Sequence, residues 1–114
     1  MTTAQLTVEA IEPAVKKAFI AAVAAGQASY EEIGERDCCG FAWASVFGIK
    51  LNTKIGKEFA RLGFSKDYNG GISIWDPAHL PTQSMTPKEV GARAFAEVLR
   101  KELGVEAYMG SRVD

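Results

Sequence analysis

The sequence predicts an α+β domain in which helices and strands alternate along the chain. Three observations carry this prediction: alternating residues at 40–49, an Asn-Gly turn signal within 64–75, and helical apolar spacing at 13–25 and 86–103. The chain has 114 residues, of which 47% are hydrophobic and 24% are charged, as expected for one globular domain. We therefore expect a single domain over 1–114, with an N-terminal helix and acidic connection in 1–37 and an α+β core in 39–114.

The first element is expected to be a helix from Pro13 to Ala25. Proline suits the first helical position, and Gly26 suits a C-terminal stop. The predicted buried stripe recurs at helical spacing and consists of Ile11, Val15, Ala18, Phe19, Ala22 and Val23. Because acidic residues are frequent in 27–37, we expect that segment to be an acidic connection between the helix and the core.

A strand is expected over 40–49, with two unlike faces. Large side chains alternate with small ones along it: Phe41, Trp43, Ser45 and Phe47 against Ala42, Ala44, Val46 and Gly48. The small face allows helices to approach closely, whereas the aromatic face requires a cover or a partner.

Next come a short helix and a hairpin. Asn52 or Thr53 can cap the helix, which is expected to end at Gly63; its predicted buried side is Ile55, Phe59 and Leu62. Asn69-Gly70 lies between two alternating segments of 64–75, and this pair favours a type I′ turn because both central residues need positive φ.

The last helix and strand follow a loop over 76–84. Thr86 and Glu89 form an expected capping box with Pro87 at the first helical position, and the helix ends before Gly104. Residues 105–113 alternate again and predict a strand. After the first helix the order is β-α-β-β-α-β, which matches the ferredoxin-like split βαβ antiparallel sheet. The additional N-terminal helix would either cover the open sheet face or reach a neighbouring chain.

No catalytic or metal-binding constellation is predicted. Cys39 and His79 could form a nucleophile and base pair, but no recognised motif surrounds either residue; a cysteine at the start of a buried strand is usually a packing residue. Cys38, Cys39, His79 and Asp76 lack the spacing of zinc ligands. Gly70-Gly71 lies within a hairpin and not before a helix, so it does not predict a phosphate loop. We expect a non-enzymatic protein without a cofactor or metal.

Cysteine usage indicates a reducing compartment. Cys38 and Cys39 are the only cysteines, and adjacent cysteines rarely bridge. Lys16 and Lys17 precede an apolar run at 18–25 that resembles a secretion signal, but the nearby Glu9 and Glu12 favour an amphipathic helix. No apolar run is long enough to span a membrane. We therefore expect a cytosolic protein that does not act at a membrane.

Two kinds of macromolecular partner remain open. The formal net charge is −1, but basic residues gather in the middle of the chain as a candidate nucleic-acid surface: Lys54, Lys57, Arg61 and Lys66. The competing candidate is a protein-docking surface or homo-oligomer seam on the aromatic strand face, formed by Phe41, Trp43, Phe47 and Trp75. The alternative to both is that the N-terminal helix covers this face and makes it core.

A set of motifs resembles a group of small uncharacterised tailed-bacteriophage proteins. The resemblance spans about 39–114 and rests on Cys39-Gly40-Phe41-Ala42-Trp43, Asn52-x-Lys54, Gly63-Phe64, Tyr68-x-Gly70-Gly71-x-x-x-Trp75, Gln83-Ser84, Ala94-Phe95-Ala96-x-Val98-Leu99 and Ser111-Arg112-x-Asp114. It implies a viral origin and a role in the infected cell or the virion, and it names no catalytic residue.

Three functional hypotheses follow. The first is a phage accessory protein in the host cytoplasm that binds a host or phage protein. The second is a virion component, such as a decoration or connector protein. The third is a nucleic-acid-binding module that uses the basic helix and the aromatic sheet face.

Overall fold

The computed structural model describes residues 6–35, 38–67 and 70–113. In chain order the elements are α1 (Val8–Ile33), β1 (Gly40–Phe47), α2 (Lys54–Arg61), β2 (Ser65–Lys66), β3 (Ile72–Trp75), α3 (Met85–Leu103) and β4 (Glu106–Val113). The four strands form one sheet in the order β2-β3-β1-β4, and every neighbouring pair is antiparallel. The predicted α+β class is therefore confirmed.

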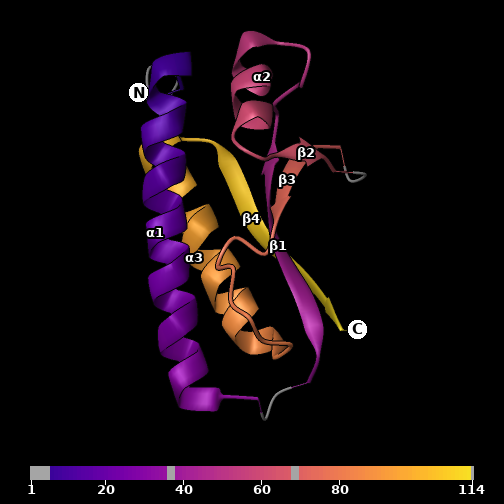
Figure 1. The fold of residues 1–114 in the computed structure, drawn as a ribbon. Helices are drawn as coiled ribbons and strands as arrows, with labels where there is room; N and C mark the ends of the chain where they lie inside the picture. Colours follow the sequence, from indigo (N-terminus) through magenta and orange to yellow (C-terminus); the bar gives the residue numbers. More distant parts are fainter. Residues whose placement is uncertain (1–5, 36–37, 68–69, 114) are drawn as a thin grey trace.

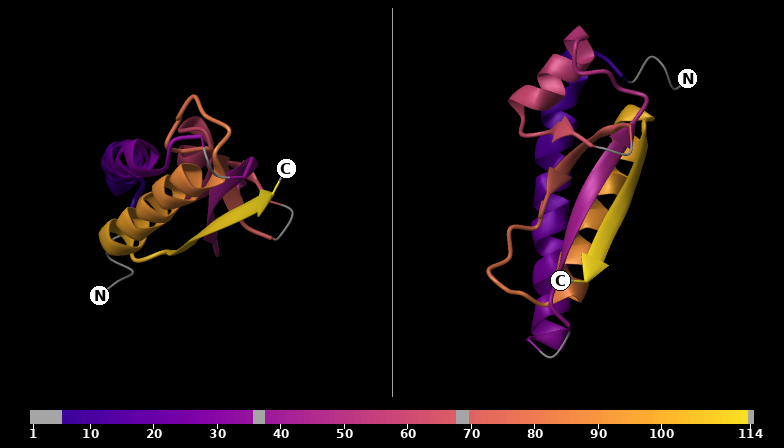
Figure 2. Two further views of the ribbon diagram at one scale, coloured as in Figure 1. Left: turned by 90° about the horizontal axis from the view of Figure 1, so that it is seen from below. Right: turned by 90° about the vertical axis from the view of Figure 1, so that its right-hand side faces the viewer.

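The molecule has a helical layer and a sheet layer. Figure 1 shows α1 alongside α3, and the right-hand view of Figure 2 shows both helices behind the sheet. The short helix α2 lies at one end of the molecule, next to the start of α1 (Figure 1). The N-terminal helix thus packs on the same side of the sheet as α3, and the opposite face of the sheet is left open.

The core lies between these two layers. On β1 the small residues Ala42, Ala44 and Val46 are fully buried, as is Ala107 on β4. These residues are cross-strand neighbours or alternate along one strand, so they share the helix-facing side. The helices contribute Ile11, Val15, Ala18, Phe95 and Leu99 to the same cluster. The predicted division of the strand into a small face and an aromatic face is confirmed.

Helix α1 is longer than predicted at both ends. It begins after Thr7, whose side chain accepts a hydrogen bond from the amide of Ala10, and it ends at Gly34 with φ +67°. Pro13 and Gly26, predicted as its boundaries, both lie inside it. Gly26 is buried, and a Cβ there would lie 3.0 Å from Ala78 Cβ. Glycine is tolerated here despite its low helix propensity because it permits close packing. The residues next to Gly26 in the sequence indicate only a helix end and do not show this tertiary contact.

Two further expectations for this segment are wrong. Val23, predicted as part of the buried stripe, is 44% exposed, because the packed face of the long helix follows Ala14, Ala18 and Ala22. Most of the predicted acidic connection, through Ile33, is helical.

Helix α2 agrees with its prediction. The side chain of Thr53 accepts a hydrogen bond from the amide of Gly56 at 3.0 Å, which makes Thr53 the N-cap. Phe59 is fully buried, and Gly63 has φ +110° immediately after the last turn.

The hairpin is also confirmed, with short strands β2 and β3. The amide of Asp67 donates to the carbonyl of Gly71, and Gly70 donates back to Asp67 with φ +99°. The closing residues are therefore separated by three residues, which is the hairpin length that places a glycine in the left-handed region. Asn69 of the predicted type I′ turn lies outside the described residues.

Helix α3 begins at Met85, so the predicted capping box is wrong. Its N-cap is Ser84, and Glu89 accepts a hydrogen bond from the Ser111 hydroxyl of β4. The amide of Met85 donates to Cys38, whose neighbour Cys39 forms a β-bridge with Ser84. This tertiary pairing sets the start of the helix. The predicted end is confirmed, because Gly104 caps the helix in the left-handed conformation.

Within the described ranges, no helix combines the length and apolarity that a membrane crossing requires.

Candidate functional site

The open side of the sheet carries the large residues of the central strands. Phe41, Trp43 and Phe47 alternate with the buried small residues of β1, so their side chains point away from the helices. Trp75 of β3 lies directly across from Trp43, and Tyr108 of β4 lies across from Ser45. We call the set Phe41, Trp43, Phe47, Trp75 and Tyr108 the aromatic face. In the right-hand view of Figure 2 it is the sheet side turned toward the viewer.

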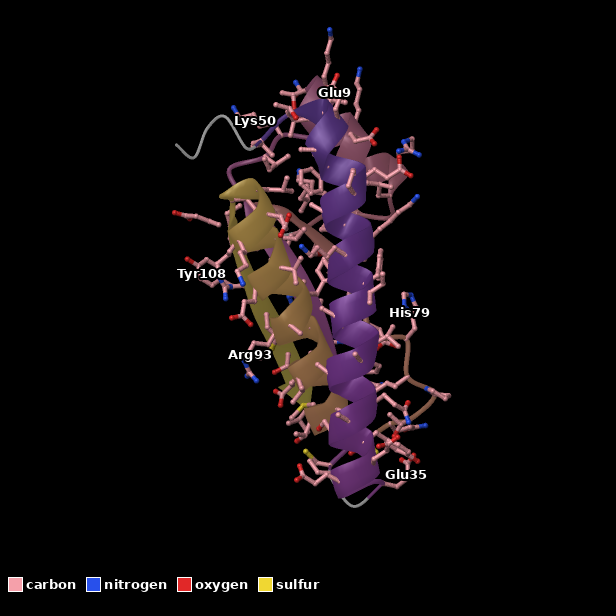
Figure 3. All side chains as sticks on the ribbon, turned by 90° about the vertical axis from the view of Figure 1, so that its left-hand side faces the viewer. Glu9, Glu35, Lys50, His79, Arg93 and Tyr108 are labelled. Atoms are coloured by element: carbon pink, nitrogen blue, oxygen red, sulfur yellow. The ribbon has the colours of Figure 1, made fainter. Side chains whose placement is uncertain are left out.

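The aromatic face is accessible. Trp75 is 50% exposed and Tyr108 is 51% exposed, while Phe41, Trp43 and Phe47 are partly buried. The side chain of Tyr108 is seen on the α3 and β4 side of the molecule in Figure 3. The alternative in which the N-terminal helix covers this face is wrong, since α1 packs against α3 on the other side of the sheet.

One part of the face is a cluster of three rings. The ring centroids of Trp43 and Trp75 are 5.0 Å apart, and Phe41 meets Trp75 edge-on at 5.9 Å. The indole of Trp43 lies over Gly110 of β4, where a Cβ would come within 2.5 Å of its Nε1 atom. The glycine therefore provides the space in which the indole lies flat, and the cluster is held together by cross-strand contacts.

The second part of the face is a pair of rings, separated from the first by a row of small polar residues. Phe47 and Tyr108 have centroids 6.4 Å apart. Between the two parts lie Ser45 and Ser73, which are cross-strand neighbours and both buried. The Ser45 hydroxyl donates to the carboxylate of the buried Asp67 at 2.7 Å, so the polar row is tied to the hairpin.

Cations lie beside the aromatic rings. The guanidinium of Arg112 is 5.9 Å from the centroid of Phe41, and that of Arg100 is 5.6 Å from the centroid of Tyr108. Such cation–π contacts add to the attraction between side chains and leave the charge at the rim of the face. The aromatic face therefore consists of two groups of rings separated by the polar row of Ser45 and Ser73, with cations at its rim.

An open cleft of about 510 Å³ borders the Phe41 end of the aromatic face and is lined by Phe41, Leu80, Pro81, Thr82, Gln83 and Lys88. Lys88 is buried, and its ammonium donates to the carbonyl of Gly40 at 3.3 Å. The hydroxyls of Thr82 and Tyr30 donate hydrogen bonds to the carboxylate of Glu35 and lower its pKa. The hydrogen bond between Tyr30 and Glu35 also raises the pKa of Tyr30. The cleft extends the aromatic face toward the 76–84 loop.

The predicted basic residues are not brought together on this face. Arg61 donates to Glu58 at 2.6 Å and to Glu12 of α1 at 2.8 Å. These hydrogen bonds lower the pKa of both carboxyls and raise that of Arg61. Lys66 is the cross-strand neighbour of the buried Ile72, which places it on the helix-facing side of the sheet edge. Lys54 and Lys57 are exposed on α2.

The residues considered for nucleophilic or metal chemistry occupy separate settings. Cys38 and Cys39 are exposed, so the interpretation of Cys39 as a packing residue is wrong. The imidazole of His79 packs against Phe19 of α1 at 5.6 Å. Across the part of the chain that the structure describes, no group of three or more potential ligands is placed to hold a metal ion.

Sequence reasoning found four of the five aromatic residues and missed Tyr108. The missing signal was register: Tyr108 belongs to the face only because β4 pairs with β1 so that Tyr108 lies across from Ser45. The alternation of 105–113 identified the strand but not which of its faces is open.

Comparisons of the chain with protein-family models, curated proteins and solved structures found no match.

Proposed function

We propose that this chain is a non-enzymatic bacteriophage accessory protein that acts in the infected host's cytoplasm by binding a host or phage protein through the aromatic face. The viral assignment rests on the motif resemblance over 39–114. The single observation that supports docking is that a cluster of aromatic side chains lies on a sheet side without a covering helix in the described chain. Tryptophan and tyrosine are enriched among the residues that dominate protein interfaces.

The fold proposed for this protein is the ferredoxin-like split βαβ arrangement with an added N-terminal helix. The strand order β2-β3-β1-β4 and the antiparallel pairing support it. The eight-residue helix α2 lies at the end of the molecule, and α1 accompanies α3 instead. Because α1 and α3 lie on the same side of the sheet, the opposite side is available for a partner.

The test is a capture experiment from infected-cell lysate with three forms of the tagged chain. The forms are the wild type, Trp75→Ala and, as the control, Ile20→Ala, which removes an exposed apolar side chain from α1, away from the aromatic face. We expect one protein to be retained by the wild type and by Ile20→Ala and lost with Trp75→Ala, with or without nuclease. Circular dichroism establishes that each variant is folded. Equal retention by all three forms contradicts the proposal.

The second candidate is single-stranded nucleic acid on the same face. It is favoured by the position of Trp43 and Trp75 on the two central strands, since neighbouring aromatic residues can stack bases. Arg112 and Arg100 would then contact phosphates. Loss of the captured material on nuclease treatment, and quenching of tryptophan fluorescence by an oligonucleotide, would favour this candidate over protein docking.

A basic-helix mode is tested separately with Lys54→Glu combined with Lys57→Glu. Arg61 is bound to two carboxylates, so its charge does not add to those of Lys54 and Lys57 in a basic surface. We therefore expect this double variant to leave any nucleic-acid affinity nearly unchanged. The third candidate, a virion component, predicts instead that the chain co-purifies with phage particles.

A further inference from the structure

The outer edge of β4 is the longest unpaired sheet edge in the described chain. The sheet ends on one side at β2, which has two residues, and on the other at β4, which has eight. Both views of Figure 2 show β4 at a margin of the molecule. Proteins usually keep edge strands short or cover them, because an exposed row of amides and carbonyls is a template for another strand.

The backbone groups on this edge can be assigned from the pairing. The amide of Asp76 donates to the carbonyl of Ala42 at 3.0 Å, so the polar groups of Ala42 point toward β3. Backbone groups alternate in direction along a strand, and those of Trp43 therefore point toward β4 and its partner Gly110. It follows that the polar groups of Ala107, Met109 and Ser111 point outward.

One contact already lies on this edge and agrees with the assignment. Arg100 of α3 donates a hydrogen bond to the carbonyl of Ala107. The carbonyl oxygen keeps a second lone pair. Because the Arg100 guanidinium also lies beside the Tyr108 ring, pairing of another strand here requires this flexible side chain to move aside.

We propose that β4 pairs with β4 of a second copy of this chain, antiparallel, about a two-fold axis between the two Met109 residues. In this register Met109 faces its own copy and Ala107 faces Ser111, and all of these residues have outward-pointing backbone groups. The remaining pairs are Glu106 with Arg112 and Tyr108 with Gly110.

Charge complementarity favours this register. Glu106 and Arg112 are both exposed and lie on the same side of β4. The two-fold axis therefore places Glu106 of each copy opposite Arg112 of the other copy, which gives two such pairs. They occupy non-hydrogen-bonded positions, where facing side chains are closest. Moving the axis to Tyr108 places Glu106 opposite Gly110, and moving it to Gly110 places Arg112 opposite Tyr108, so in neither register do Glu106 and Arg112 face each other. The strand is therefore self-complementary about Met109.

The resulting dimer has one continuous sheet of eight strands. Because the two-fold axis is perpendicular to the sheet, both aromatic faces lie on the same side. The dimer leaves the aromatic face open, so the inference is independent of the partner proposed above.

The test is a charge exchange read by sedimentation equilibrium. We expect the wild type to have twice the mass of one chain. Glu106→Arg alone and Arg112→Glu alone each set like charges opposite each other, so association should weaken on the order of tenfold or more. The double exchange should restore it. Within one chain these residues are six apart on an extended strand, about 20 Å, so only pairing between copies explains a rescue.

A second measurement identifies the edge itself. Amide hydrogen exchange should show Met109 and Ser111 protected in the wild type and unprotected in the single variants, with circular dichroism unchanged. A monomeric wild type, a dimer in which these amides exchange freely, or a folded double exchange that fails to dimerise would each overturn the inference.

Discussion

Gly110 decides the position of Trp43, the central residue of the aromatic face. A Cβ at this position would lie 2.5 Å from Nε1 and 2.6 Å from Cε2 of the indole. These ring atoms belong to a rigid group that is also packed against Trp75, so the ring can yield only by changing its rotamer. One glycine on β4 therefore controls the geometry of the rings on β1 and β3.

Gly110→Ala should lower the free energy of unfolding by about 1–3 kcal/mol, the usual cost of overpacking. It should also shift tryptophan fluorescence, and urea denaturation followed by fluorescence checks both effects. In a Trp43→Leu background the same substitution should leave the free energy of unfolding nearly unchanged, because the indole that the added methyl group would contact is absent. An equal loss in both backgrounds contradicts the assignment.

Ser84 is an unusual N-cap. Its side chain makes no capping hydrogen bond, and its buried hydroxyl oxygen has no hydrogen-bond partner among the residues that the structure describes. Replacing an N-cap serine by alanine ordinarily costs about 0.5–2 kcal/mol. Here no hydrogen bond is lost and a buried unsatisfied hydroxyl is removed.

We therefore expect Ser84→Ala to leave the free energy of unfolding unchanged or to raise it by up to about 1 kcal/mol. The matched control is Thr53→Ala, which removes a capping hydrogen bond from α2 and should show the ordinary loss. Urea denaturation of both variants measures the contrast, and a comparable loss in Ser84→Ala would be evidence against it.

At the scale of elements, the approach of α1 to α3 depends on small residues. Gly91 of α3 is buried, and a Cβ there would lie 2.5 Å from Ala78 Cβ and 3.0 Å from the carbonyl of Ala22. Glycine in a helix is normally unfavourable by about 1 kcal/mol relative to alanine. Its presence in the middle of α3 is explained by the closeness of the neighbouring backbone.

Gly91→Ala should destabilise the protein by about 1–3 kcal/mol despite the better helix propensity of alanine, because the added methyl group overpacks the contact. The control is Ala24→Gly at an exposed position of α1, which should cost about 1 kcal/mol through propensity alone. Thermal and urea unfolding distinguish the two, and stabilisation by Gly91→Ala would contradict the packing argument.

At the scale of the whole molecule, α1 is part of the single core and not an appendage. Ile11, Val15 and Ala18 are each at most 1% exposed and belong to the same cluster as Phe95 and Ile72. Burial of one large aliphatic side chain contributes about 1.5–3 kcal/mol, a large share of the stability of a domain of this size.

A chain that begins at residue 35 should therefore fail to fold cooperatively. Circular dichroism and two-dimensional NMR of the shortened chain measure this, and well-dispersed amide signals from the shortened chain would show that 39–114 is an independent unit.

The ion pairs between α1 and α2 predict a pH dependence. Arg61 lowers the pKa of Glu12 and of Glu58 below the ordinary 4.5. Carboxyls with depressed folded-state pKa values stabilise the fold above their unfolded pKa, and this contribution is lost as the pH falls through the folded values. Stability should thus decrease between about pH 5 and pH 3, and Arg61→Ala should flatten that part of the profile. An unchanged profile in the variant would rule out this contribution.

The sequence alone determined the α+β class, the two unlike faces of β1, the hairpin and the ends of α2 and α3, because these depend on periodicity and on residues within a few positions. Tertiary structure decided the length of α1, the start of α3 and the membership of Tyr108 in the aromatic face. Gly26 is a local stop signal that packing overrides, and the register of β4 depends on a partner strand some sixty residues earlier in the chain. Above all, the side of the sheet on which α1 packs is a long-range choice, and it leaves the aromatic face open.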